Sequence, residues 1–333
     1  MNKSHTRILV DLFQLGQITA PPMTVAGGLL HKMWRLETDQ GCYACKHLDW
    51  EIMKKPGVHE RYQKSEELAN RLFKAGIPAM TALNNDGKFV QRLGDDYYIL
   101  FPWTDAKILP ESQQTLEHSR KIGDILGRMH CTLATDKPSN NLQVSYDANE
   151  EFEFWIDRYI DGELMDFDTL IQWKDRLLEY NKPNKEILAR LNQSCLYSHG
   201  DIHIRNILWI NEADPIIIDW ESAHPYHTST ELLAAAMNMA GIEYNRIELD
   251  HFDVFIDAYK EHFHVDPESA SDAWWALYQA EMDWIIFNLK KSFRDDNTDA
   301  KIGQEQVSAM FKVMDVFDEK KSACIKIIEK HGS

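Results

Sequence analysis

The chain has 333 residues, 44% of them hydrophobic and 27% charged, which is enough to bury more than one core. Its net charge is −17 at pH 7, and the excess is uneven: residues 1–106 hold 13 basic and 12 acidic side chains, whereas the remainder holds 23 and 41. A surface this acidic disfavours nucleic acid as a partner. No stretch approaches the roughly 18 consecutive apolar residues of a membrane span, and the N-terminal residues lack the apolar core of a signal peptide. We therefore expect a cytoplasmic protein with neither a nucleic-acid nor a membrane partner.

Residues 24–48 are predicted to form two or three strands joined by turns. They include a C-x-x-C at Cys42 and Cys45, a spacing that also occurs in redox and zinc sites. Residues three apart on a strand face opposite sides, and no second C-x-x-C follows. We therefore expect these cysteines to belong to a strand rather than to a functional pair.

A helix and a further strand complete the predicted N-terminal lobe. The segment 65–78 places Leu68 and Leu72 one helical turn apart and closes on a glycine and a proline. The segment D-D-Y-Y-I-L-F-P-W (95–103) is an apolar strand that its proline ends. Strands, one helix and strands again predict a small antiparallel α+β lobe over residues 1–103.

From about residue 110 the pattern becomes helical. Apolar residues recur at helical spacing at positions 122, 126, 129 and 133, and further helical segments follow to the end of the chain. Residues 104–333 are therefore predicted to form a larger, mainly helical lobe. The expected fold class is α+β with two lobes, a small antiparallel sheet lobe and a helical one.

One strand-like stretch, residues 196–220, interrupts the predicted helices. It contains two apolar runs, I-L-W-I and P-I-I-I, separated by the polar turn N-E-A-D. A turn centred in the middle of N-E-A-D pairs Ile207 with Ile218. The next pair outward is then Asn206 with Asp219, about 4.5–5.5 Å apart at their Cα atoms.

Asp201 precedes Asn206 by five residues, so the chain can bring it back to the same open end of the hairpin as Asp219. Carboxylate and amide oxygens clustered in this way suit Mg²⁺, which takes one or two carboxylates and completes its shell with phosphate and water. The spacing H-x-D-x-x-x-x-N followed by a strand ending in Asp is also that of a kinase catalytic loop.

H-G-D-I-H-I-R-N followed by I-I-I-D-W-E resembles the motif pair of the aminoglycoside phosphotransferase and choline kinase family, which are small-molecule kinases with a protein-kinase-like fold. The resemblance implies that Asp201 accepts or orients the substrate hydroxyl. It also implies that Asn206 and Asp219 hold Mg²⁺ against the phosphates of ATP.

The resemblance further implies a nucleotide site in the first lobe. Lys46 would grip the α- and β-phosphates, oriented by Glu66 or Glu67. The phosphate loop keeps only two glycines, which leaves GTP as an alternative to ATP. The other expected nucleotide contacts are Gly27 and Gly28 in that loop and the backbone groups of Phe101 and Trp103 at the hinge.

The acceptor is expected to be a small molecule bound by the helical lobe, because no long activation segment follows the second motif. Aromatic faces, carboxylates and the acidic balance of this lobe favour a cation, with an aminoglycoside-type antibiotic preferred. A choline-like amine, a macrolide and a metabolic sugar or amino alcohol are alternatives. The residues expected to line the acceptor site are Trp155, Asp157, Glu163, Trp274, Glu281, Asp283 and Trp284.

Two other classes of function are compatible with parts of the sequence. A metal-dependent hydrolase could use His199, Asp201 and His203 on one strand face, with His224 and His227 as further nitrogen ligands. A non-catalytic, nucleotide-binding relative of the kinases is the second alternative.

Overall fold

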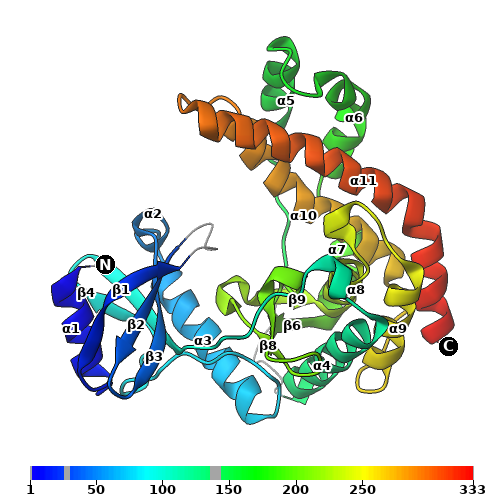
Figure 1. Cartoon of the computed structure of the whole chain (residues 1–333). Coiled ribbons are helices and arrows are strands. Elements are labelled where there is room, and N and C mark those ends of the chain that lie inside the picture. The colour runs from blue at the N-terminus through cyan, green and yellow to red at the C-terminus, as the bar shows by residue number, and fades with distance from the viewer. Residues whose placement is uncertain (1, 26–30, 136–143, 333) are drawn as a thin grey trace. The chain divides into compact units, whose positions relative to one another are not determined.

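The computed structural model describes residues 2–25, 31–135 and 144–332, which form two compact units (Figure 1). The first, here called the sheet unit, comprises Met1–Leu109 and Arg205–His224. The second, the helical unit, comprises Pro110–Ile204 and Pro225–Ser333. The predicted α+β class, with a small antiparallel sheet and a larger helical part, is confirmed. The segment Arg205–His224, which the sequence prediction counted with residues 104–333, packs with the sheet unit.

The sheet unit contains a five-stranded antiparallel sheet with the order β1-β2-β3-β5-β4. Its strands are β1 (Ile18–Val25), β2 (Lys32–Thr38), β3 (Gly41–His47), β4 (Gln91–Leu93) and β5 (Asp96–Pro102), and its helices are α1 (Lys3–Leu12), α2 (Trp50–Met53) and α3 (Val58–Lys74). The C-x-x-C lies on β3 as predicted; Cys45 is buried, and both cysteines are free thiols.

Each face of this sheet carries its own apolar core. On β5, Tyr98 and Leu100 pack with Leu9 of α1, whereas Ile99 between them packs with Tyr62 of α3. This alternation is the period of two that a strand imposes on its side chains. The sheet therefore holds α1 and α3 on opposite faces, and α3 begins seven residues before the predicted segment 65–78.

The predicted hairpin is present, but its register differs from the prediction by one residue. β7 (Ile207–Trp209) pairs with β8 (Pro215–Ile217) so that Ile207 lies opposite Ile217 rather than Ile218. The side chain of Asn211 accepts hydrogen bonds from the N–H groups of the third and fourth residues of N-E-A-D. This Asx-type capping favours a loop with an odd number of residues between the two strands. The predicted pairing of Asn206 with Asp219 is therefore wrong by one residue.

The helical unit contains eight α-helices in its described part and a two-stranded sheet. Close approach of α4 to α9 depends on two glycines: a Cβ built at Gly123 would lie 2.3 Å from the carbonyl oxygen of Phe255, and one at Gly127 would lie 2.6 Å from that of Tyr259. The elements are α4 (Leu116–Thr135), α5 (Phe152–Asp161), α6 (Phe167–Tyr180), α7 (Lys185–Leu191), β6 (Cys195–Ser198), β9 (His224–His227), α8 (Thr228–Met239), α9 (Leu249–Lys260), α10 (Ala270–Lys291) and α11 (Asn297–His331). Short 3₁₀ turns occur at η1 (Glu111–Gln113), η2 (Asn192–Ser194), η3 (Ile204–Asn206), η4 (Trp220–Ser222) and η5 (Ile242–Tyr244).

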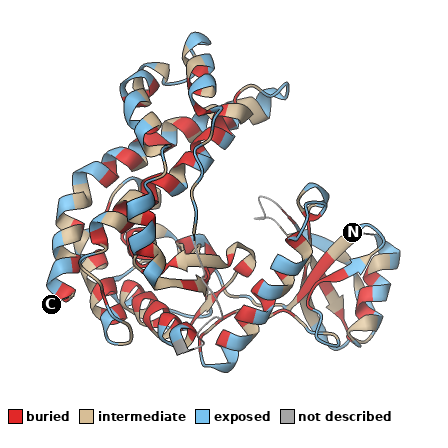
Figure 2. Cartoon of the chain, turned by 180° about the vertical axis from the view of Figure 1, so that it is seen from behind, coloured by how far each residue is buried: buried red, intermediate tan, exposed pale blue. Residues whose placement is uncertain are grey.

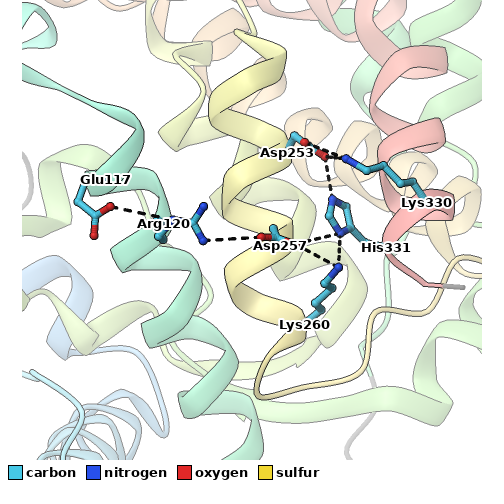
Figure 3. Close-up of polar contacts among 7 residues, drawn as sticks. All are labelled: Glu117, Arg120, Asp253, Asp257, Lys260, Lys330 and His331. Carbon is cyan, nitrogen blue, oxygen red and sulfur yellow. Dashed lines mark hydrogen bonds and ion pairs between the residues drawn. The ribbon is translucent and has the colours of Figure 1, made fainter.

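The long helix α11 lies along α10, with α5 and α6 beside them (Figure 1). Its buried residues recur every three or four positions and form one stripe, while the opposite side is exposed (Figure 2). Its last turn is tied to α9, because Asp253 accepts hydrogen bonds from Lys330 and from Nε2 of His331 (Figure 3). The other members of this charged cluster are Glu117, Arg120, Asp257 and Lys260. Among the residues described, no helix combines the length and apolarity that a membrane span requires.

Candidate active site

Lys46 on β3 lies among carboxylates that follow the hairpin strand β8. Its Nζ atom lies 2.6 Å from Oδ1 of Asp219 and also donates to Oε2 of Glu221. Asp219 has a left-handed backbone (φ +65°) that turns the chain into η4 and brings both acids back toward β3. Burial opposes the charge of Lys46, but the two carboxylates outweigh burial, so the pKa of Lys46 lies above its ordinary value.

A buried histidine holds Glu221 in this position. Nδ1 of His31 accepts the N–H of Asp49 at 2.9 Å, so a neutral ring carries its proton on Nε2. That Nε2 atom lies 2.8 Å from the hydroxyl of Tyr62 and 3.2 Å from Oε2 of Glu221. Sequence reasoning assigned no role to Glu221, which lies in the D-W-E motif, or to His31, which it placed at the tip of the phosphate loop.

Of the two acids predicted as partners of Lys46, Glu66 lies close enough for the two charges to interact. Glu66 is buried, and its Oε2 atom has no hydrogen-bond partner among the described residues. Burial raises the pKa of Glu66 to about 8, although the charge of Lys46 acts in the opposite direction. Glu67 is exposed and accepts a hydrogen bond from Gln63.

The backbone groups at the end of β5, where the sequence predicts the adenine contacts, alternate between the two edges of the strand. The N–H of Trp103 donates to the carbonyl of Cys42. Two residues before Trp103, Phe101 lies opposite Ala44 of β3. In an antiparallel pair this alternation turns the backbone groups of Phe101 and Trp103 toward β3. Pro102, which has no N–H, directs its carbonyl to the opposite edge. An adenine contact within residues 101–103 stays a prediction, and these directions favour the carbonyl of Pro102 over the backbone groups of Phe101 and Trp103. Gly27 and Gly28 lie outside the described residues.

Asn206 and Asp219 are brought to one end of the hairpin. The backbone carbonyl of Asn206 accepts the N–H of Ile218, the residue before Asp219. The side chain of Asp219 is 38% exposed, whereas Asn206 is buried. One carboxylate and one amide oxygen fit a hydrated Mg²⁺ that is completed by phosphate.

The described residues do not support the zinc alternative. They contain no cluster of three His, Cys, Asp or Glu side chains that could hold a metal ion. His203 faces a carboxylate from each ring nitrogen, and Nδ1 of His224 lies 2.6 Å from the carbonyl of Ser222. These nitrogens act as hydrogen-bond or ion-pair groups rather than as metal ligands.

Asp201 follows β6 in a loop anchored by buried polar groups of the helical unit. The N–H of Gly200, a residue with φ +74°, donates to Oε1 of Glu231 at 2.8 Å. Oε2 of the same carboxylate lies 2.8 Å from Nε2 of His130 on α4. Burial would raise the pKa of Glu231, but the hydrogen bond from His130 and its charge lower it. The N–H of Asp201 itself donates to Nδ1 of the buried His199 at 3.2 Å. The loop is thus held from beneath, while the Asp201 carboxylate is 45% exposed.

Several of the expected acceptor residues have other partners. Trp274 is fully buried and packs edge-to-face on Phe317, so it belongs to the core. Asp157 forms an ion pair with Lys174 at 2.5 Å. The remaining members differ in exposure: Trp155 is half-buried beneath Arg158, Trp284 is exposed and stacked on Phe287, and Glu163 and Asp283 are exposed.

Glu281 on α10 is the acidic candidate with an unusual environment. Its side chain is half-buried, and burial alone raises its pKa to about 7. Tyr226 on β9 is influenced by the charges of both Glu281 and Asp201. Both carboxyl groups belong to the helical unit and act on the pKa of the same tyrosine.

Comparisons with known proteins identify the family and the fold. Residues 23–275 match the model of a family described as the phosphotransferase enzyme family. No curated protein matches the chain by sequence. The fold is similar to that of a spectinomycin phosphotransferase in complex with ADP and spectinomycin, with 14% identity and a TM-score of 0.64 over 95% of this chain and 98% of that one.

Two further solved structures share the fold. An amicoumacin kinase in complex with AMP-PNP, Ca²⁺ and its antibiotic is 13% identical, with a TM-score of 0.63 over 96% of each chain. A macrolide 2′-phosphotransferase from Brachybacterium faecium is 13% identical, with a TM-score of 0.54 over 91% of this chain and 98% of that one.

Proposed function

Because the chain belongs to the phosphotransferase enzyme family, we propose that it transfers the γ-phosphoryl group of ATP to a hydroxyl of a small, cationic molecule. The observation that carries this proposal is the cluster of Lys46, Asp219 and Glu221 at the end of β8, which combines a phosphate-binding cation with metal-binding carboxylates. A positioned cation and hard oxygen ligands are the groups that phosphoryl transfer requires.

Asp201 takes the role of the base. An exposed carboxylate on a loop anchored from beneath can accept the proton of an acceptor hydroxyl as the new oxygen–phosphorus bond forms. Asn206 and Asp219 would hold Mg²⁺. When bound, this ion would neutralise part of the charge on the phosphates of ATP. Lys46 turns from its two carboxylates to the α- and β-phosphates when a nucleotide arrives.

The adenine base forms hydrogen bonds with the end of β5, along the edge that faces away from β3. The carbonyl of Pro102 accepts from the adenine amino group, and the N–H of Thr104, two residues later, donates to the ring. This assignment follows from the direction of the Trp103 N–H toward Cys42. GTP, which carries a carbonyl where ATP has an amino group, is the alternative nucleotide.

A cationic acceptor is supported by Glu281. A half-buried carboxyl group with a pKa near 7 gains most from an ammonium partner, because pairing offsets the cost of ionising it away from water. An aminoglycoside-type antibiotic is the preferred acceptor. A macrolide, a choline-like amine and a metabolic sugar or amino alcohol remain alternatives.

The test is a coupled ADP-release screen over aminoglycosides, spectinomycin-like and peptide antibiotics, macrolides and amino alcohols, with ATP and GTP in parallel at fixed Mg²⁺. We expect one cationic class to release ADP and to yield a phosphorylated product by mass spectrometry. Asp201→Ala should lower kcat by about 10²–10⁴-fold while nucleotide binding is retained. Nucleotide binding with no transfer to any acceptor would favour the non-catalytic alternative, and an active Asp201→Ala would contradict the role of that residue.

A further inference from the structure

Asp201, His203 and Glu243 form a chain of ionisable side chains within the helical unit. Nε2 of His203 lies 3.6 Å from Oδ2 of Asp201, and Nδ1 lies 3.3 Å from Oε1 of Glu243. The side chains of His203 and Glu243 are 22% and 18% exposed, whereas that of Asp201 is 45% exposed. The imidazole ring therefore bridges an inner carboxylate and an outer one.

This arrangement favours a charged ring. Each ring nitrogen faces a carboxylate oxygen, and a neutral imidazole can donate from only one of its nitrogens. Burial disfavours the charge of His203, but the hydrogen bonds and charges of Asp201 and Glu243 outweigh burial and raise its pKa to about 9. His203 is therefore a cation at neutral pH, placed directly beside the proposed base.

The elements around this chain bring further groups toward Asp201. Tyr226 on β9 is influenced by Asp201, and burial raises the pKa of this phenol well above its ordinary value, so it stays neutral. Glu281 on α10 and the buried Glu231 on α8 act on the same tyrosine. Glu231 accepts the N–H of Gly200, the residue before Asp201, so its negative charge makes the ionised form of Asp201 harder to maintain and gives the cationic His203 a function.

We propose that His203 is a positioning residue, which Glu243 holds in its charged form so that it keeps Asp201 ionised and fixes the orientation of its carboxylate. The proposal rests on the role of Asp201 in the proposed function. In the reaction the hydroxyl proton passes to Asp201 as the oxygen–phosphorus bond forms and the bond to ADP breaks. His203 keeps its proton throughout and acts through Asp201.

The first test uses the wild-type protein without nucleotide or acceptor. The Cε1–H resonances of its 14 histidines are followed by NMR from about pH 5.5 to about pH 10, and the His203 resonance is identified by its loss in His203→Gln. We expect its midpoint near 9 in the wild type and at least about one unit lower in Glu243→Gln. If His203→Gln does not fold, the resonance that moves in Glu243→Gln identifies the ring. A midpoint near the ordinary value of 6.5 in the wild type overturns the proposal.

The second test measures phosphotransfer as a function of pH. In His203→Gln we expect kcat to fall about 10–100-fold with an unchanged KM for ATP, and the acid limb of kcat to move up by about one pH unit. Glu243→Gln should move the alkaline limb to lower pH, because it lowers the pH at which the ring loses its charge. The matched control is His264→Gln, an exposed histidine of the same unit, which should leave both limbs unchanged.

Unchanged pH limbs in both variants, or an effect confined to KM, would show a merely structural role and overturn the proposal. Failure of the proposed function has a different signature, since the wild type would then phosphorylate no acceptor while the histidine titration could still be measured.

Discussion

Nζ of Lys46 lies 2.6 Å from Oδ1 of Asp219, a residue 173 positions later in the chain. The contact exists because the hairpin β7–β8 packs with the segment that follows α3: the N–H of Ile217 donates to the carbonyl of Pro78, and its carbonyl accepts from the N–H of Met80. The left-handed turn at Asp219 then directs two carboxylates toward β3. The proposed phosphate-binding lysine and the proposed metal-binding aspartate thus belong to one packed unit.

Replacing Asp219 by Ala should weaken nucleotide binding through the metal. We expect the affinity for ATP at fixed Mg²⁺ to fall about 100-fold, because a direct oxygen ligand is lost. Binding in the presence of EDTA should hardly change between wild type and variant. Calorimetric titration with a non-hydrolysable ATP analogue measures both. Glu212→Ala, at the exposed turn of the same hairpin, is the control, and equal Mg²⁺-dependent affinities for Asp219→Ala and wild type would contradict the metal role.

The Glu66→Gln variant should alter the pH dependence of stability. Glu66 ionises near pH 8 in the folded chain and near 4.5 when unfolded, so the folded state binds the extra proton between these values. Stability contributed by this proton is full below about pH 4.5 and is lost as the pH rises toward 8. A glutamine cannot ionise and avoids this loss. We expect the variant to gain on the order of 4 kcal/mol relative to wild type between pH 5 and pH 9.

Thermal unfolding of wild type and Glu66→Gln at pH 5 and pH 9 checks this expectation. Glu67→Gln, the exposed neighbour on α3, should show no such gain.

The same variant also tests which acid holds Lys46. Because Glu221 and Asp219 contact Lys46, the KM for ATP should rise less in Glu66→Gln than in Glu221→Gln. The reverse order would make Glu66 the functional partner of Lys46.

Local sequence was enough to predict the fold class, the strands and the hairpin that carries Asn206 and Asp219. The register was not predictable from the apolar runs alone, because the side chain of Asn211 caps two N–H groups and sets the loop length. The direction of the Trp103 N–H could not be predicted either, because it depends on pairing with Cys42 on a strand about 60 residues earlier.

Contacts between distant segments explain the other misses. The sequence did not indicate that Glu221 is a further partner of Lys46, because the contact depends on His31, which holds Glu221 beside the lysine. Trp274 has the helical spacing that is usual for core residues, and its packing on Phe317 of α11, 43 residues later, could not be predicted from local sequence. Glu243 is separated from His203 by a whole helix and had no sequence signal.

Binding of a cationic acceptor should depend on pH through Glu281. Below about pH 7 this carboxyl group is protonated and cannot pair with an ammonium group, so we expect the KM of the acceptor to rise as the pH falls. Glu281→Gln should raise that KM about tenfold at pH 8 and remove most of the pH dependence. Steady-state kinetics with one acceptor over this range measures both effects. Glu268→Gln, an exposed acid just before α10, is the control, and an unchanged KM in Glu281→Gln would exclude this acid from the acceptor site.

Replacing Gly123 by Ala should destabilise the helical unit. In an exposed helix this change would stabilise by up to about 1 kcal/mol, because alanine has the higher helix propensity. Here the added Cβ would lie 2.3 Å from the carbonyl oxygen of Phe255, which is backbone and cannot rotate away. The helices α4 and α9 must separate, and we expect the free energy of unfolding to fall by about 1–3 kcal/mol. The sign of the change therefore shows whether the two helices are in close contact. Denaturant unfolding of Gly123→Ala and of Cys131→Ala, an exposed position on the same helix, provides the measurement and its control. A stabilised Gly123→Ala would mean that α4 and α9 do not approach this closely.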